Sequence, residues 1–261
     1  MIYLFSKIGR QFLESLSYTQ TLYAFDFDGT LSKIVLDPPK AAITLPRQVL
    51  LRQLGEVADV AIISGRGLDD LRSKFSGEPH FFVGNHGLEG VGEQHEISQE
   101  AVAWKQQLET AFRIQLPKGY GIEIEDKGVS LAVHYRKSRH KKQVKAAILA
   151  LVETLNPTPR VVLGKCVINL VPESGFNKGT AFLSLMRDSG AKAGFYIGDD
   201  DTDEDVFGLS QDLCLLTVRV GQKKQSKARF YIKNQGEITR LLTVLASFYT
   251  PSQSPVKGDD T

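Results

Sequence analysis

Short apolar segments that end in polar residues recur along the chain and predict a sheet of parallel strands. The segments Leu22–Phe27, Val60–Ile63, Phe81–Val83 and Gly194–Ile197 are mostly apolar or aromatic, and glycine, charged or other polar residues follow each of them. Strands that alternate with helices favour a parallel sheet covered on both faces. The helices that we expect around these strands cover residues 46–55, 68–75, 178–189 and 236–248.

The pattern changes in the middle of the chain. Two alternating segments, Ile122–Glu125 and Val129–Tyr135, are joined by Asp126-Lys127-Gly128, which indicates a β-hairpin. Helices are expected at residues 98–115 and 140–155, and short strands at 160–163 and 166–171. The predicted fold class is therefore α/β, a doubly wound parallel sheet with an inserted α+β cap domain. We expect core domain segments at 1–90 and 174–250, the cap at 91–173, hinges near 87–92 and 172–175, and a disordered tail at 251–261.

Composition and charge exclude several classes of protein. The net charge of +2 gives no support to binding of nucleic acid or of a membrane surface. The longest apolar run, Ala146–Val152, has seven residues and is too short to span a membrane. Residues 1–16 are typical of a short amphipathic helix rather than of a signal peptide. Cys166 and Cys214 are isolated and flanked by apolar residues, which favours buried thiols in a reducing cytoplasm, without a disulfide framework or zinc site.

The string Asp26-Phe27-Asp28-Gly29-Thr30-Leu31 follows the first strong strand. Side chains two residues apart in a strand point to the same side, so the carboxylates of Asp26 and Asp28 would repel each other in one cavity. A magnesium ion relieves that repulsion, because it prefers oxygen ligands and takes one or two carboxylates together with water and substrate phosphate. The alternative is a helix cap or an Asx-turn. The full six-residue string favours the cation site.

Three further motifs lie where ligands collect in a parallel sheet, at or near the carboxyl ends of strands. Ser64-Gly65-Arg66 offers a hydroxyl and backbone N–H groups to an anion, although a simple turn explains it as well. Lys178 begins a predicted helix and is either a charge for a phosphate oxygen or ordinary surface. Six of the seven residues from 199 to 205 are acidic. The helix dipole accounts for some of these acids, but a cation site accounts better for Asp199 and Asp200.

In this order, the four motifs resemble the haloacid dehalogenase superfamily of phosphohydrolases and, within it, the trehalose-6-phosphate phosphatase family. The resemblance covers roughly residues 20–248, and it is stronger in the core motifs than in the cap. The strings that carry it are Asp26-Phe27-Asp28-Gly29-Thr30-Leu31, Ile63-Ser64-Gly65-Arg66, Gly84-Asn85-His86-Gly87-Leu88-Glu89 and Gly198-Asp199-Asp200-Asp201-Thr202-Asp203-Glu204-Asp205-Val206-Phe207.

The resemblance implies a Mg²⁺-dependent phosphatase that acts through an aspartyl-phosphate. It makes Asp26 the nucleophile and Asp28 the acid and base, with Lys178 as the third catalytic residue. The implied metal-binding residues are Asp26, Asp28 through its backbone carbonyl, Asp199, and Asp200 and Asp203 as holders of water or of neighbouring groups. The implied substrate-binding residues are Asp26, Phe27, Asp28, Ser64, Gly65, Arg66, Asn85, His86, Glu125, Lys127, His134, Arg136 and Asn169.

The substrate implied by the resemblance is trehalose 6-phosphate, and a trehalose-6-phosphate synthase is the implied companion enzyme. Asn169 stands where the family pattern leads us to expect glutamate, so another glycosyl or sugar phosphate is the alternative substrate. A phosphotransferase would share the first steps, and a non-catalytic module would be expected to have lost one of the core residues. Two basic stretches, 136–145 and 223–229, are ordinary surface or steer an anionic substrate.

Overall fold

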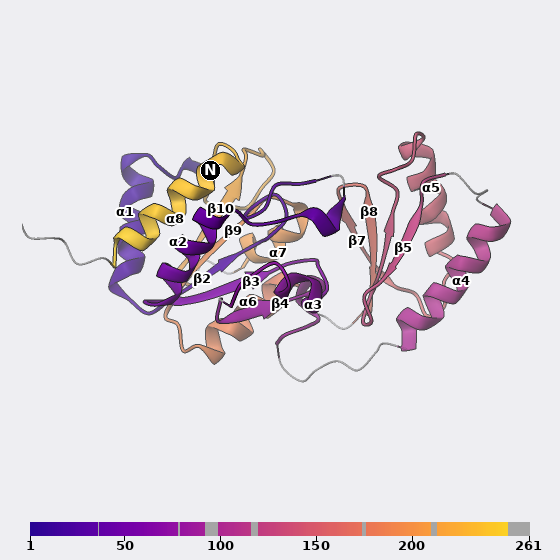
Figure 1. Cartoon of the computed structure of the whole chain (residues 1–261), viewed down its shortest axis with the longest axis horizontal. Coiled ribbons are helices and arrows are strands. Elements are labelled where there is room, and N and C mark those ends of the chain that lie inside the picture. The colour runs from indigo at the N-terminus through magenta and orange to yellow at the C-terminus, as the bar shows by residue number, and fades with distance from the viewer. Residues whose placement is uncertain are drawn as a thin grey trace, which may run out of the picture.

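A computed structural model describes residues 1–35, 37–77, 79–91, 99–115, 120–173, 176–209 and 213–249. Figure 1 shows two units, a larger core around one sheet and a smaller unit around a second sheet. The predicted class, a doubly wound α/β fold with an α+β cap, is confirmed. The predicted tail at 251–261 and parts of both predicted hinges lie outside the described residues, and the domain limits stay a proposal.

The core sheet has seven parallel strands in the order β1, β11, β10, β9, β2, β3, β4. Apolar side chains of helices α1, α2 and α8 cover one face, and those of α6 and α7 cover the other. The strands are β1 (Ile2–Tyr3), β2 (Thr21–Phe25), β3 (Asp59–Ile63), β4 (Phe81–Val83), β9 (Ala193–Gly198), β10 (Leu215–Val220) and β11 (Phe230–Ile232). The helices are α1 (Lys7–Ser15), α2 (Leu45–Gly55), α3 (Leu68–Arg72), α6 (Lys178–Asp188), α7 (Glu204–Phe207) and α8 (Ile238–Ser247).

The cap is a four-stranded antiparallel sheet in the order β5, β6, β8, β7. Its apolar side chains, such as Val133 and Ile168, pack with those of helices α4 and α5. In Figure 1 the cap sheet lies between these two helices and the core, so its other face is turned toward the core. The cap elements are α4 (Gln99–Gln115), β5 (Glu123–Asp126), β6 (Leu131–His134), α5 (Lys141–Val152), β7 (Arg160–Gly164) and β8 (Val167–Val171).

The predicted helices and strands are confirmed to within a few residues at their ends, but three strands were missed. β1, β10 and β11 lengthen the core sheet on one side, and β1 takes up residues that the sequence assigned to an N-terminal helix. The expectation of two buried cysteines is wrong. Cys166 is half-buried in the turn between β7 and β8, where its φ is +64°, and Cys214 is exposed just before β10. Apolar neighbours in sequence did not imply burial, because both residues lie at strand ends.

Strand register decides which polar residues meet at the edge of the core sheet. Phe25 at the end of β2 pairs with Ile197 of β9, and the backbone N–H of Asp26 donates to the carbonyl of Ile197 at 2.9 Å. Asp26 and Asp199 therefore leave neighbouring strands at the same edge.

Among the described residues, no helix has both the length and the apolar composition that a membrane-spanning segment needs.

Candidate active site

A cavity lies where the carboxyl ends of the core strands face the cap sheet. Both units line it, so groups more than a hundred residues apart in sequence share one space. Most of the predicted site residues are brought together here. Those that line the cavity are Asp26, Asp28, Ser64, Gly65, Arg66, His86, Glu125, Lys127, His134, Arg136, Asn169, Lys178, Asp199 and Asp200.

The centre of the cavity floor is a buried ion network around Lys178. The Lys178 Nζ lies 2.8 Å from Asp26 Oδ1 and 2.7 Å from Asp203 Oδ1. Lys178 is the first residue of α6, where the side chain of Asn177 caps the helix by accepting from the N–H of Thr180. The cap fixes the start of the helix, and the ammonium is thereby held against the end of β2.

Burial and charge oppose each other in this network. Burial raises the pKa of Asp26, and Lys178 lowers it in return, leaving the pKa of Asp26 well above its usual range. Burial lowers the pKa of Lys178, but the charges of Asp203 and Asp26 outweigh it and raise that pKa well above its ordinary value. Lys178 is therefore a fixed cation, and a further positive charge beside Asp26 would favour the ionised form of that carboxyl.

Asp26, Asp199 and Asp203 present oxygens that all lie within 4.8 Å of one another. Burial raises the pKa of Asp199. A Cβ at residue 29 would lie 2.1 Å from Asp199 Oδ2, so Gly29 permits the close approach of the two segments. Clustered carboxylate oxygens are the donor set that a hard divalent cation prefers. This arrangement fits a divalent cation, which Asp26 and Asp199 are placed to hold.

Asp203 and Asp200 serve as supports for this centre. Asp203 is fully buried, and its oxygens accept from Lys178, from the Tyr196 hydroxyl at 2.7 Å and from the N–H of Asp200 at 2.8 Å. The Asp200 carboxylate accepts from the N–H of Asp201. Because both oxygens of Asp203 already accept from protein donors, Asp203 orients Lys178 and the loop after β9, and Asp200 caps the turn that follows. Asp203 does not line the cavity among the described residues.

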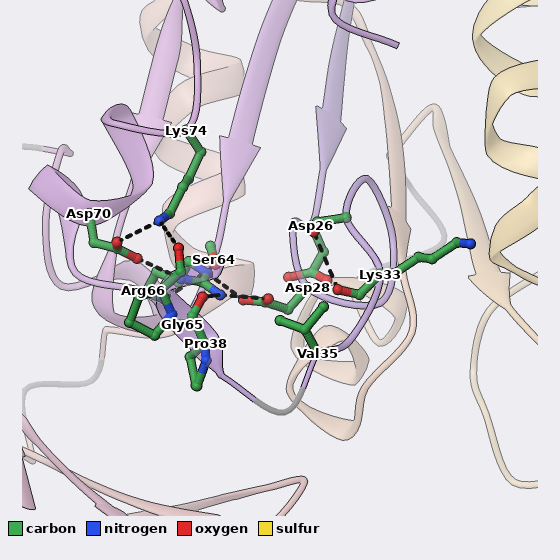
Figure 2. Close-up of polar contacts among 12 residues, drawn as sticks. Asp26, Asp28, Lys33, Val35, Pro38, Ser64, Gly65, Arg66, Asp70 and Lys74 are labelled. Atoms are coloured by element: carbon green, nitrogen blue, oxygen red, sulfur yellow. Dashed lines mark hydrogen bonds and ion pairs between the residues drawn. The ribbon is translucent and has the colours of Figure 1, made fainter. Parts of the chain in front are cut away.

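Arg66 holds the second carboxylate of the first motif, as Figure 2 shows. Its Nε and Nη2 donate to the two oxygens of Asp28 at 2.6 and 2.8 Å, and its Nη1 donates to Asp70 at 2.6 Å. Burial alone would lower the pKa of Arg66, but these hydrogen bonds reverse the shift and raise it. A bidentate guanidinium fixes the carboxylate in one plane. Arg66 thus orients Asp28 at the cavity wall.

The cap side of the cavity is built from alternate residues of the open sheet face. Glu125 Oε2 lies 2.7 Å from His134 Nε2, and this contact lowers the pKa of Glu125 although burial opposes it. Lys127 Nζ donates to the carbonyl of Gly65 at 2.7 Å, which joins the cap to the core. Asn169 Nδ2 donates to the carbonyl of Val162 at 3.2 Å. These groups present charges and hydrogen-bonding atoms to a polar ligand.

Three predicted substrate-binding residues, Phe27, Asn85 and His86, differ from the others in burial or in backbone conformation. Phe27 is fully buried, under the guanidinium of Arg66. Asn85 is also fully buried; it accepts from the Ser130 hydroxyl and donates to the carbonyl of Lys127, so it fastens the cap. His86 lines the cavity with a φ of +58°, and burial lowers its pKa well below the ordinary value. Of these three, His86 alone can contact a ligand in the cavity.

Several residues that support the candidate active site were not predicted from the sequence. Arg219 on β10 is buried and donates to the backbone carbonyls of Asp199 and Asp200 at 2.8 and 3.1 Å. Lys165, in the turn between two predicted strands, reaches Asp199. The only sequence signals were a charged residue in an apolar segment and a lysine after glycine, and both patterns are common at surfaces. Asp70, which binds Arg66, and Tyr196, which donates to Asp203, were also missed.

A parallel sheet with an aspartate after a central strand, a buried lysine opposite it and an inserted cap defines the haloacid dehalogenase-like class of phosphohydrolase folds. The model of the trehalose-phosphatase family matches residues 24–235. The chain belongs to this family.

The relatives agree with this assignment. Trehalose-phosphate phosphatase of Mycobacterium ulcerans is 34% identical over 193 residues, which are 70% of this chain and 50% of that protein. The protein of the same name from Mycobacterium leprae is 31% identical over 208 residues, 74% of this chain and 48% of that protein. The chain spans about half the length of the curated relatives it matches.

Solved structures support the fold. The C-terminal domain of Candida albicans trehalose-6-phosphate phosphatase superposes with a TM-score of 0.75 at 24% identity, covering 92% of this chain and 97% of that one. The C-terminal domain of the Candida albicans trehalose synthase regulatory protein has a TM-score of 0.67 at 14% identity, covering 94% and 99%. At these identities the likeness concerns the architecture of core and cap.

Proposed function

We propose that this protein is a magnesium-dependent phosphatase that hydrolyses trehalose 6-phosphate through an aspartyl-phosphate on Asp26. One observation carries the proposal: Lys178 Nζ bridges Asp26 and Asp203 in a buried network that also adjoins Asp199. A carboxylate, a fixed ammonium and a cation site around one point are what phosphoryl transfer requires. The names of the mycobacterial relatives supply the substrate.

In the first step, an oxygen of Asp26 attacks phosphorus, and the bond between phosphorus and the sugar oxygen breaks. To give a proton to the departing sugar oxygen, Asp28 must enter this step in its protonated form, with one of its two oxygens released from Arg66. In the second step, water attacks the phosphorus of the aspartyl-phosphate while Asp28 takes its proton, and Asp26 leaves as a carboxylate. Lys178 stays protonated through both steps and neutralises charge on the phosphoryl oxygens, with the Ser64 segment beside it.

Asp26 and Asp199 would hold the magnesium ion, together with the backbone carbonyl of Asp28. When bound, the ion supplies positive charge that favours the ionised carboxylate and offsets the charge of the phosphoryl group. Arg219 fixes the backbone that carries Asp199, so the ligand is positioned before the ion arrives.

The cap would recognise the sugar. Glu125, Lys127 and His134 place charged and hydrogen-bonding groups at one wall of the cavity, suited to sugar hydroxyls. The phosphate would lie at the opposite wall, near Lys178. The expected cytoplasmic location and the companion trehalose-6-phosphate synthase stay predictions.

The test is release of inorganic phosphate from trehalose 6-phosphate with magnesium, after exhaustive chelation, and after magnesium add-back. Asp26→Asn should lower the turnover rate by about 10⁴-fold or more while the protein stays folded. Asp201→Asn is the matched control, because Asp201 lies in the same acidic run but does not line the cavity; it pairs with the surface residue Lys223 and, at 3.8 Å, with Arg219. Near-normal turnover by Asp26→Asn, or full turnover after chelation, would contradict the proposal.

One observation favours a phosphatase of the same mechanism with another sugar phosphate as substrate. Asn169 stands where glutamate is expected, and its Nδ2 is engaged by the carbonyl of Val162, which leaves fewer groups for sugar hydroxyls. A panel that includes glucose 6-phosphate separates the two functions. Comparable values of kcat/KM for glucose 6-phosphate and trehalose 6-phosphate would support the alternative, and a strong preference for the disaccharide would exclude it.

A further inference from the structure

The turn between β7 and β8 brings a lysine of the cap onto a carboxylate of the core. Lys165 Nζ lies 2.6 Å from Asp199 Oδ2, and the two side chains are 49% and 9% exposed. Among the described residues, this is the one ion pair that joins the cap to the core. It involves the carboxylate that the proposed function gives to magnesium.

The turn that presents Lys165 is braced on both sides. The Arg136 Nη2 donates to the carbonyl of Lys165 at 2.9 Å, and the Nη1 of the same guanidinium contacts the carbonyl of Val35 in the core. The backbone N–H of Tyr135 donates to the carbonyl of Cys166 at 3.1 Å. Lys165 is therefore held in place at its backbone, unlike a lysine on a free loop.

Asp199 differs from its two neighbours in the cation cluster. Asp26 and Asp203 share Lys178, an internal cation that burial and hydrogen bonds hold in place. The charged partner of the Asp199 side chain is Lys165, which reaches it from the other unit. An ammonium is a compact point charge, and a hard divalent cation at the Asp199 carboxylate would lie close to it. Two positive charges at this short separation repel each other, so the two cations compete for Asp199.

We propose that Lys165 is a positioning residue that stands in for the divalent cation and couples cation binding to the cap. Without the cation, the ion pair between Lys165 and Asp199 joins the cap to the core. A cation that takes Asp199 displaces the ammonium and removes this link between the units. By linkage, closing the cap weakens cation binding by the same factor by which the cation weakens closure. The inference rests on the proposed function for the identity of the site.

The test is to titrate magnesium into the substrate-free protein and to measure its dissociation constant by isothermal titration calorimetry. Lys165→Met removes the competing charge, and the dissociation constant for magnesium should fall by about fivefold, the effect of losing one partly exposed ion pair. Lys165→Arg keeps a cation at the same place and should restore the wild-type constant. Lys137→Met is the matched control, because Lys137 makes an ion pair of the same 2.6 Å length with Glu123 on the cap, outside the cavity.

The outcomes separate this inference from the proposed function. Tighter binding in Lys165→Met, with Lys165→Arg and Lys137→Met unchanged, supports the competition. Equal or weaker binding in Lys165→Met, with the wild type binding magnesium, overturns it and leaves the proposed function standing. Absence of magnesium binding in every variant, including Lys165→Met, overturns both.

Discussion

The two walls of the cavity are built differently. In the core wall and directly behind it, the side chains of Asp26, Lys178 and Asp203 are 5%, 2% and 0% exposed, and Lys178 pairs with both carboxylates. On the cap wall, the side chains of Glu125 and His134 are 48% and 24% exposed and pair mainly with each other. Charges interact strongly where water is excluded and weakly where it is not. The core wall is therefore fixed before a ligand arrives, whereas the cap wall can exchange its own contacts for those of a ligand.

The backbone explains the same contrast. Asp26 and Asp199 follow two adjacent central strands whose pairing runs from Thr21 to Phe25 of β2. Of the pair on the cap wall, Glu125 lies on β5, an edge strand of the cap sheet, and His134 lies on the inner strand β6. A central strand is restrained on two sides and an edge strand on one. We infer that chemistry resides on the core wall and recognition on the cap wall.

The largest effect should come from removing the cation of the core wall. Lys178→Met leaves Asp26 and Asp203 buried without their partner, so the free energy of unfolding should fall by about 3–5 kcal/mol. Phosphate release should fall by about 10³-fold, because the phosphoryl oxygens lose a preorganised charge. Urea unfolding and steady-state kinetics measure the two effects. Lys223→Met, at a surface pair with Asp201, should change stability by less than about 0.5 kcal/mol.

A double variant makes this prediction sharper. Lys178→Met with Asp203→Asn removes one buried negative charge together with the cation, so part of the lost stability should return while activity stays low. Recovery of activity in the double variant, or near-normal turnover in Lys178→Met, would show that the core wall does not work through this charge.

Some residues of the site could be predicted from the sequence and others could not. Asp26, Lys178 and Asp199 could be predicted because each follows or begins an element with a clear apolar pattern. Lys165 and Arg219 could not, because their roles depend on which strands lie side by side. Leu215–Val220 contains a threonine and an arginine, which hid a buried strand, and Ile2–Tyr3 is too short to show alternation. Asn85 was correctly placed near the cap, but its partners are protein groups.

A smaller effect is expected on the cap wall. Glu125→Gln should raise KM for trehalose 6-phosphate by about tenfold and change kcat by less than about twofold, because a contact made equally in the ground and transition states is lost. Glu123→Gln is the matched control, since Glu123 lies on the same strand and pairs with Lys137 away from the cavity. A fall in kcat without a change in KM would place Glu125 in the chemical step and break the contrast between the walls.

The support behind the core wall should matter for stability more than for turnover. Tyr196→Phe keeps the buried ring and removes the hydroxyl that donates to Asp203. The free energy of unfolding should fall by about 1–2 kcal/mol, since Asp203 loses one of its hydrogen bonds in a buried site. Activity should drop by less than about tenfold, because Lys178 still contacts Asp203. Unchanged urea unfolding would mean that the hydroxyl adds nothing to the network.

The smallest effect concerns Asp70, at the solvent side of Arg66. Burial alone would raise its pKa, but hydrogen bonds from Arg66 and Lys74 lower it below the unfolded value of about 3.9. A lowered folded pKa contributes stability above about pH 4, and this is lost as the pH falls through the folded pKa. Asp70→Asn should therefore cost about 0.5 kcal/mol at pH 7, a modest amount because the side chain is partly exposed, and the cost should shrink toward pH 2.

Urea unfolding midpoints of Asp70→Asn and wild type at pH 7, 4 and 2 measure this change. Asp69→Asn on the same helix is the control, because Asp69 is exposed and makes no ion pair among the described residues; its difference from wild type should stay near zero at each pH. A difference for Asp70→Asn that grows as the pH falls would have the wrong sign for a carboxylate stabilised by Arg66. Arg66 would then be held chiefly by Asp28. The contact between Arg66 and Asp70, at the outer edge of the core wall, would add little to stability, like the exposed contacts of the cap wall.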